Sequence, residues 1–224
     1  MKDNTRGALF SGVISLLAFT VWTILIQTVD VQAVGPRGSE VGFAAFNVWF
    51  HQLTGVHMTL YTVTDWLGLV PIFICICFGI LGLIQLIRRK SLLKVDPDII
   101  LLGVYYILVI ACYLLFEMIP INYRPILIDG FLEASYPSST TLLVLSVTPT
   151  LVFQSRRRAR SGAVKTATLI FAAVFSAFMV IGRLIAGVHW VTDIIGSVLL
   201  SAGLFSLYLT AVTYTDKRKK YGIQ

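Results

Sequence analysis

Residues 66–87 read WLGLVPIFICICFGILGLIQLI and contain no charged side chain, and this stretch decides the fold. An α-helix rises 1.5 Å per residue, so about 20 apolar residues cross the roughly 30 Å hydrocarbon core of a bilayer. The whole chain is 57% hydrophobic and 13% charged, whereas soluble domains are about 25% charged. Further apolar segments lie at residues 8–27, 99–116, 140–154, 164–182 and 194–215. We therefore predict an all-α integral membrane protein, a single domain over residues 1–224 with six transmembrane helices.

Two segments depart from this simple pattern. Residues 38–55 are semi-apolar and aromatic but also contain Glu40, Asn47 and His51. This mixture is typical of a helix that lies in the membrane interface, here between the first and second spans. The apolar segment 140–154 is too short to cross a bilayer alone, so we expect its ends to sit in protein or in a water-filled cavity.

The distribution of positive charge predicts the orientation. Of the 18 Lys and Arg residues, 15 lie in the N-terminus, in the loops after the second and fourth spans, and in the C-terminal tail. The opposite side has only Arg37, Arg124 and Arg183. Cytoplasmic loops are enriched in Lys and Arg, so both termini are predicted to be cytoplasmic. The basic runs are accordingly interpreted as orientation signals and contacts to anionic membrane lipids, with no nucleic-acid partner.

A pair of polar residues stands between the fifth and sixth spans. His189 and Asp193 are separated by four positions, which places them on one face of a helix. A carboxylate there can accept the Nδ1 proton of the imidazole and direct Nε2 outward as a nucleophile. The alternative is structural, because Asp is common at helix N-termini.

Other polar residues on the same side suit a phosphate group. Ser138 and Ser139 follow Pro137, which indicates a helix start whose free N–H groups can bind an anion. Arg124 and Arg183 have planar guanidinium groups that match phosphate oxygens. A plain helix cap and interfacial arginines are the alternatives. Taken together, these residues predict a phosphate site with a nucleophile.

The order Arg124-Pro125, then Pro137-Ser138-Ser139, then Arg183-x5-His189-x3-Asp193 resembles the type 2 phosphatidic acid phosphatase family, which shares its site with vanadium haloperoxidases. The resemblance implies a core at about residues 99–215, a site facing outward from a bacterial-type plasma membrane, and a phosphatase without metal or other cofactor. It also implies that His189 is phosphorylated, that Asp193 orients it, and that Arg124, Arg183 and the amides of Ser138 and Ser139 hold the phosphate of a lipid substrate.

Two positions depart from the family pattern. Thr140 stands where the family has a His that protonates the leaving group, and Glu117 stands where it has a Lys. A missing general acid typically lowers the rate by about 10²–10⁴. A phosphate leaving group, with a second pKa near 6, hardly needs that proton. Any surviving activity is therefore expected to favour diphosphates such as polyprenyl diphosphates.

Three further expectations concern the outer side. His51 or His57 could fold over the site and act as the acid, although either could equally be an interfacial histidine. Glu117 could pair with Arg124, about two helical turns further on, or be exposed at the interface. A catalytically impaired homologue that binds or transfers lipid phosphates is the alternative function. The sequence carries no signal for an oligomeric state.

Overall fold

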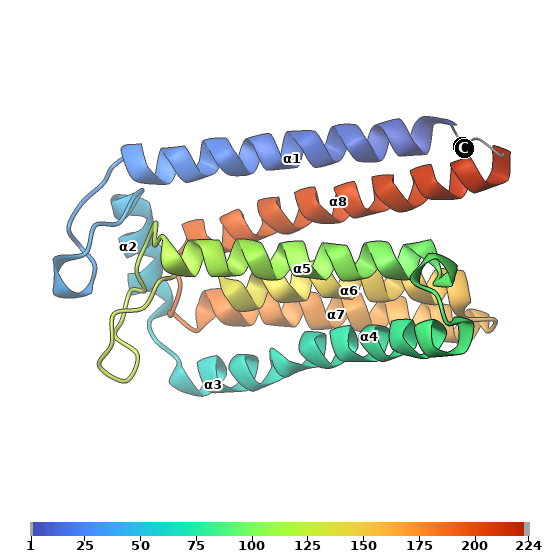
Figure 1. Ribbon diagram of the computed structural model, residues 1–224. Coiled ribbons are helices and arrows are strands. Elements are labelled where there is room, and N and C mark those ends of the chain that lie inside the picture. The colour runs from blue at the N-terminus through green and yellow to red at the C-terminus, as the bar shows by residue number, and fades with distance from the viewer. Residues whose placement is uncertain (1, 222–224) are drawn as a thin grey trace.

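The computed structural model describes residues 2–221, which form a bundle of α-helices and contain isolated β-bridges but no β-strand. Figure 1 shows the long helices lying side by side, with α3 leading directly into α4 and the short α2 at one end of the bundle. The prediction of an all-α protein is confirmed. The helices are α1 (Lys2–Thr28), α2 (Ala44–Thr54), α3 (Met58–Leu67), α4 (Leu69–Arg89), α5 (Pro97–Met118), α6 (Ser139–Arg158), α7 (Gly162–Ile185) and α8 (Val191–Tyr221).

Among the described residues, five helical stretches are long and apolar enough to cross a membrane. They correspond to α1, to α3 with α4, to α5, to α7 and to α8. Hydrophobic side chains cover their outward faces, as with the exposed Phe73 and Ile107. This pattern is that of a multi-pass membrane protein. The second stretch begins at Met58, eight residues before the start predicted at Trp66, because α3 leads directly into α4.

The fourth predicted span, residues 140–154, corresponds to α6, which is longer and more polar than expected. It runs from Ser139 to Arg158, 20 residues, and ends in three arginines that favour a helix C-terminus. It contacts α4, α5, α7 and α8 and buries polar side chains among them. Two of them have side-chain partners on other helices: the Tyr106 hydroxyl lies 2.7 Å from Thr150 Oγ1, and Gln154 donates to the Tyr208 hydroxyl at 2.8 Å. The helix is therefore suited to the centre of a bundle, and the total of six spans stays a prediction.

The two ends of the bundle differ. The N-terminal end of α1, the C-terminal end of α8 and the α4–α5 and α6–α7 connections lie at one end (Figure 1). Some of the basic residues at this end form ion pairs within the protein. Arg157 and Arg158 both contact Asp98, at 3.3 and 2.9 Å. The other end carries α2 and the long α1–α2 and α5–α6 loops. The predicted interfacial segment 38–55 is thus a helix at Ala44–Thr54 only, preceded by a short 3₁₀ turn at Pro36–Gly38.

The α5–α6 loop is held in place from inside the bundle. Tyr136, near the end of this loop, is buried and stacks against Phe19 of α1 with ring centroids 6.0 Å apart. Its hydroxyl lies 2.7 Å from Thr23 Oγ1. Its ring packs against Gly196, where a Cβ atom would lie only 2.3 Å from the Tyr136 ring. Only glycine at 196 admits this contact without movement. The loop is therefore anchored to α1 and α8 immediately before Pro137 and Ser138.

Candidate phosphate-binding active site

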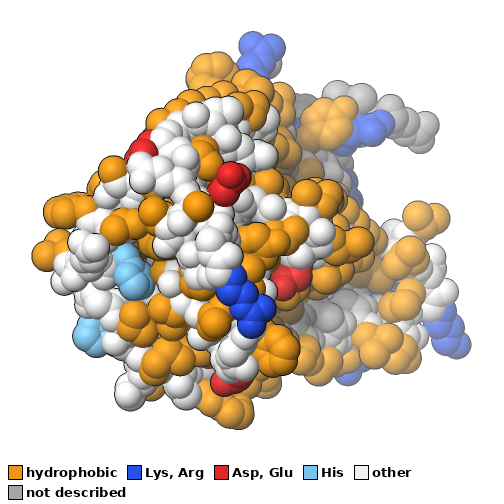
Figure 2. Space-filling view, turned by 90° about the vertical axis from the view of Figure 1, so that its left-hand side faces the viewer, with side chains coloured by type: hydrophobic (Ala, Val, Ile, Leu, Met, Phe, Trp, Pro, Cys, Tyr) orange, Lys and Arg blue, Asp and Glu red, His pale blue; other side chains and the backbone are white. Residues whose placement is uncertain are grey.

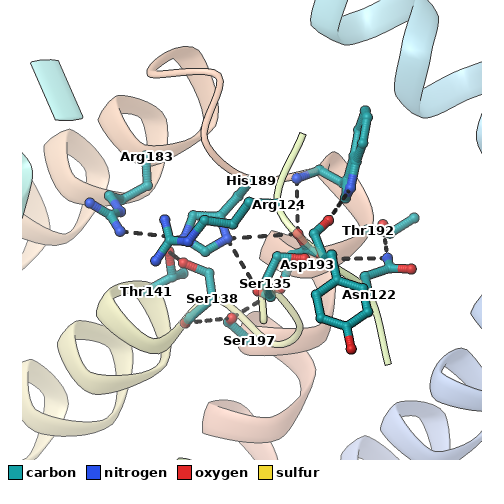
Figure 3. A network of polar contacts seen from close by, with 12 residues as sticks. Asn122, Arg124, Ser135, Ser138, Thr141, Arg183, His189, Thr192, Asp193 and Ser197 are labelled. Carbon is teal, nitrogen blue, oxygen red and sulfur yellow. Dashed lines mark hydrogen bonds and ion pairs between the residues drawn. The ribbon is translucent and has the colours of Figure 1, made fainter. Parts of the chain in front are cut away.

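His189 lies in the short α7–α8 connection, buried among groups that fix its tautomer. The chain reaches it through Gly187, whose φ of +70° and close approach to Gly55 require glycine. Nδ1 lies 3.1 Å from the Ser135 carbonyl oxygen, and Nε2 lies 3.3 Å from Nη2 of Arg183. A carbonyl only accepts, so Nδ1 carries the proton and the Nε2 lone pair faces the arginine. Figure 3 shows these contacts converging on the ring.

The electrostatics of this position favour the neutral imidazole. Burial, followed by the positive charges of Arg124 and Arg183, lowers the pKa of His189 well below its ordinary value. A neutral ring with a free Nε2 lone pair is the form that can attack phosphorus.

Asp193 sits in the first turn of α8 and is fully buried. Its Oδ2 accepts the backbone N–H of Trp190 at 2.9 Å, and its Oδ1 accepts an N–H of Asn122 at 3.2 Å. The structure differs from the prediction in one detail, because Oδ2 is 3.7 Å from His189 Nδ1 and the Ser135 carbonyl is closer. Asp193 thus caps the helix, and its carboxyl group lies behind the imidazole without accepting the Nδ1 proton.

The two arginines are brought together although they are 59 positions apart. Arg183, in the last turn of α7, is 1% exposed, and Arg124 is 8% exposed. Their guanidinium carbons lie 4.9 and 5.9 Å from the ring centroid of Tyr61. Arg124 Nη1 and Arg183 Nε are buried and have no hydrogen-bond partner. Unpaired donors on two neighbouring cations are suited to the oxygens of a phosphate.

Carboxylates hold both guanidinium groups in the structure. Arg124 Nε lies 2.9 Å from Glu133 Oε2, and Arg183 Nη1 lies 3.5 Å from Asp65 Oδ1. The expected partner of Arg124 was Glu117, but the α5–α6 loop folds back and brings Glu133 to it instead. Glu117 is exposed and lines the same cavity. Neither Asp65, Glu133 nor Tyr61 could be identified from sequence, because each reaches the site only through packing of α3 or a loop.

α6 begins at the serines where the sequence indicates a helix start, but the backbone N–H of Ser138 already has a partner within the protein. Ser138 is the N-cap residue and Ser139 begins the helix, so the first helical N–H groups have no partner within the helix. The N–H of Ser138 itself donates to the carbonyl of Asp193 at 3.3 Å, and its hydroxyl lies 3.1 Å from Thr141 Oγ1. The Ser138 amide is therefore engaged, whereas Ser139 lines the cavity beside His189.

A polar cavity and an apolar groove meet at this point. The cavity has a volume of about 260 Å³ and includes His189, Arg124, Glu117, Glu133 and Ser139 in its lining. The groove has a volume of about 480 Å³ and runs between α4, α5 and α6. Tyr113 and Ser139 line both. A phosphate head and a hydrocarbon tail could occupy the two spaces together.

The remaining candidate residues lie at the groove or outside the cavity. Thr140 lines the apolar groove, together with Asp65. The His51 ring nitrogen contacts the Gly187 carbonyl at 3.2 Å, and the His57 ring nitrogen contacts the Thr54 carbonyl at 2.9 Å. Neither ring lines the cavity that holds His189. Figure 2 looks onto this end of the bundle, where charged and histidine side chains stand among polar and hydrophobic ones.

Comparison with known proteins defines the class of this fold. A family model described as the PAP2 superfamily matches residues 113–217. This match covers the predicted core apart from its first turns and includes every polar motif described above. No curated protein matches the chain. Residues 113–217 are therefore similar to the PAP2 superfamily, within a chain that has the helices of a multi-pass membrane protein.

Among solved structures, the chain is similar to the first transmembrane PAP2 type phosphatidylglycerolphosphate phosphatase from Bacillus subtilis. The TM-score is 0.67 at 19% sequence identity, and the alignment covers 92% of this chain and 97% of that chain. At this identity the likeness shows a common fold, that of a transmembrane PAP2-type phosphatase.

Proposed function

We propose that the protein is a membrane lipid phosphatase that acts through a phosphohistidine on His189 and prefers lipid diphosphates. The observation that carries this proposal is the state of His189, which has Nδ1 bound to a carbonyl and Nε2 beside Arg183. The similarity to the PAP2 superfamily and the shared fold support the reaction class. The adjoining apolar groove supports a lipid substrate.

The residues suggest how the first step proceeds. Arg124 and Arg183 bind the phosphate oxygens through their unpaired N–H groups, together with the N-terminal amides of α6. His189 Nε2 attacks phosphorus, the bond to the leaving oxygen breaks, and the electron pair departs on that oxygen. Asp193, behind the ring, stabilises the positive charge that develops on the imidazole. The two arginines and the helix terminus supply the positive charge, so we propose that no metal ion is needed.

The leaving group decides which substrates react. Thr140 lies in the groove where the lipid would depart, and its hydroxyl does not act as an acid near neutral pH. A lipid alkoxide needs a proton to leave, whereas a lipid monophosphate departs as a stable anion. We therefore propose polyprenyl diphosphates as preferred substrates of an enzyme in a bacterial-type plasma membrane, with the site outside.

The test is release of inorganic phosphate by the purified protein in detergent, with undecaprenyl diphosphate compared with phosphatidic acid. We expect release from the diphosphate, much slower release from phosphatidic acid, and none in His189→Ala. A strong preference for phosphatidic acid would contradict the leaving-group reasoning. Undiminished release by His189→Ala would contradict the phosphohistidine.

A second candidate is a lipid-phosphate-binding homologue with little turnover. The observation that favours it is that Glu133 and Asp65 already occupy the two arginines and that Thr140 supplies no acid. Tight binding of undecaprenyl diphosphate without phosphate release or phosphohistidine would favour this candidate over the enzyme.

A further inference from the structure

A diphosphate substrate removes the need for a general acid only in the first step of the proposed reaction, in which the phosphoryl group is transferred to His189. After the lipid monophosphate has left, a water molecule must attack the phosphorus on His189. Water is a weak nucleophile and requires a base that removes its proton in the transition state. Thr140 offers no such base, so turnover depends on another group that lies beside the phosphorylated Nε2.

Asp65 is linked to Nε2 of His189 through Arg183. Its Oδ1 lies 3.5 Å from Nη1 of Arg183, and Nη2 of the same guanidinium lies 3.3 Å from Nε2 of His189. The Asp65 carboxylate and the His189 imidazole therefore contact the two terminal nitrogens of the same guanidinium group. A phosphoryl group on Nε2 that is held by Arg183 would lie next to Asp65.

The surroundings of Asp65 suit a base that handles water. Its side chain is 58% exposed, so water reaches it. It lines the apolar groove with Thr140 and Ser139, on the side where the lipid departs. Water that follows the departing lipid would enter beside Asp65.

The other carboxylates at this end are less suited to the task. Asp193 is fully buried on the Nδ1 side of the ring and is bound by Trp190 and Asn122. Glu133 is bound to Arg124 at 2.9 Å. Glu117 lines the polar cavity but not the groove. Asp65 is thus the carboxylate that combines contact with Arg183, exposure to water and a place in the groove.

We propose that Asp65 is the general base that hydrolyses phospho-His189, an inference that rests on the proposed function. Its carboxylate takes one proton from water while the water oxygen bonds to phosphorus. The P–N bond breaks, and its electron pair returns to Nε2 of His189. Inorganic phosphate leaves, and Asp65 then releases its proton to solvent. The first step does not use Asp65.

The experiment separates the two steps by rapid quench of the purified full-length protein in detergent with undecaprenyl diphosphate. In Asp65→Asn we expect a normal burst of about one undecaprenyl phosphate per protein, an accumulating acid-labile phosphohistidine, and steady phosphate release lowered by about 10²-fold or more. Asp65→Glu, which keeps a carboxylate, should release phosphate within about tenfold of the wild type. Asp129→Asn, an exposed carboxylate on the α5–α6 loop, is the matched control and should behave as the wild type.

The outcomes distinguish this proposal from the function on which it rests. A burst that falls in parallel with steady release in Asp65→Asn would show that Asp65 merely positions Arg183, and would overturn the proposal. Unchanged steady release in Asp65→Asn, or release by Asp65→Glu as slow as by Asp65→Asn, would also overturn it. His189→Ala should give no burst. If the wild type forms no phosphohistidine, the proposed function itself is wrong.

Discussion

Asp193→Asn tests whether the buried carboxylate is a helix cap or an electrostatic partner of His189. An asparagine can still accept the Trp190 N–H through its side-chain oxygen, so the cap is kept while the charge is removed. The Ser135 carbonyl continues to hold Nδ1, so the tautomer is kept as well. The substitution therefore removes the charge behind the imidazole and keeps both contacts, while the new NH2 group faces Asn122, whose amide must turn its oxygen toward it.

The magnitude follows from the distance. Phosphorylation makes the ring positive, and Oδ2 lies 3.7 Å from Nδ1. At an effective dielectric constant of about 20, two unit charges at this distance attract by about 4 kcal/mol. The N–H groups of Trp190 and Asn122 already stabilise part of the negative charge, so we take this as an upper bound. Formation of the phosphohistidine should slow by about 10²–10³-fold.

The assay is the single-turnover rate of phosphohistidine formation with undecaprenyl diphosphate, measured beside the thermal midpoint of unfolding in detergent. We expect a slower rate and a nearly unchanged midpoint in Asp193→Asn. Asp193→Ala should show the same loss of rate and also a lower midpoint, because the lost cap costs about 1 kcal/mol. A rate in Asp193→Asn within about threefold of the wild type would refute the electrostatic role and leave only the cap.

Three further predictions concern other parts of the site. Thr140→His should raise the release of phosphate from phosphatidic acid by about 10²-fold or more, because the alkoxide leaving group of this lipid needs an acid. Release from undecaprenyl diphosphate should change far less, and equal gains on both lipids would contradict this reasoning. Gly187→Ala should destabilise the fold by about 2–5 kcal/mol, because a Cβ would meet the Gly55 carbonyl at 2.1 Å at a φ of +70°. Gly130→Ala, also at positive φ but with open space around it, should cost only about 1–2 kcal/mol by thermal unfolding. Burial and the two arginines lower the pKa of His189, so the imidazole stays neutral as pH falls. The rate of phosphorylation in a single-turnover pH series should therefore decline only well below the ordinary histidine pKa of about 6.5. A decline centred at about 6.5 or above would contradict a buried, neutral ring.

The sequence alone indicated the helical membrane architecture and the polar motifs around Arg124, Ser138, Arg183, His189 and Asp193. Both follow from local patterns, since an apolar run of about 20 residues needs a bilayer whatever surrounds it. The spacing of Arg183, His189 and Asp193 is likewise local, because they lie within eleven consecutive positions around one helix start. The length and burial of α6 could not be predicted in the same way, because its polar side chains are stabilised by hydroxyl groups on α5 and α8.

The tertiary structure decided which groups contact the reactive ones. The Ser135 carbonyl and not Asp193 holds the imidazole proton, since the backbone of a loop anchored through Tyr136 comes closer than the side chain. Glu133 and not Glu117 reaches Arg124, because the α5–α6 loop turns back on itself. Asp65 reaches Arg183 only because α3 packs against α7. Contacts between distant segments depend on how whole helices and loops pack, and spacing along the chain carries no record of that packing.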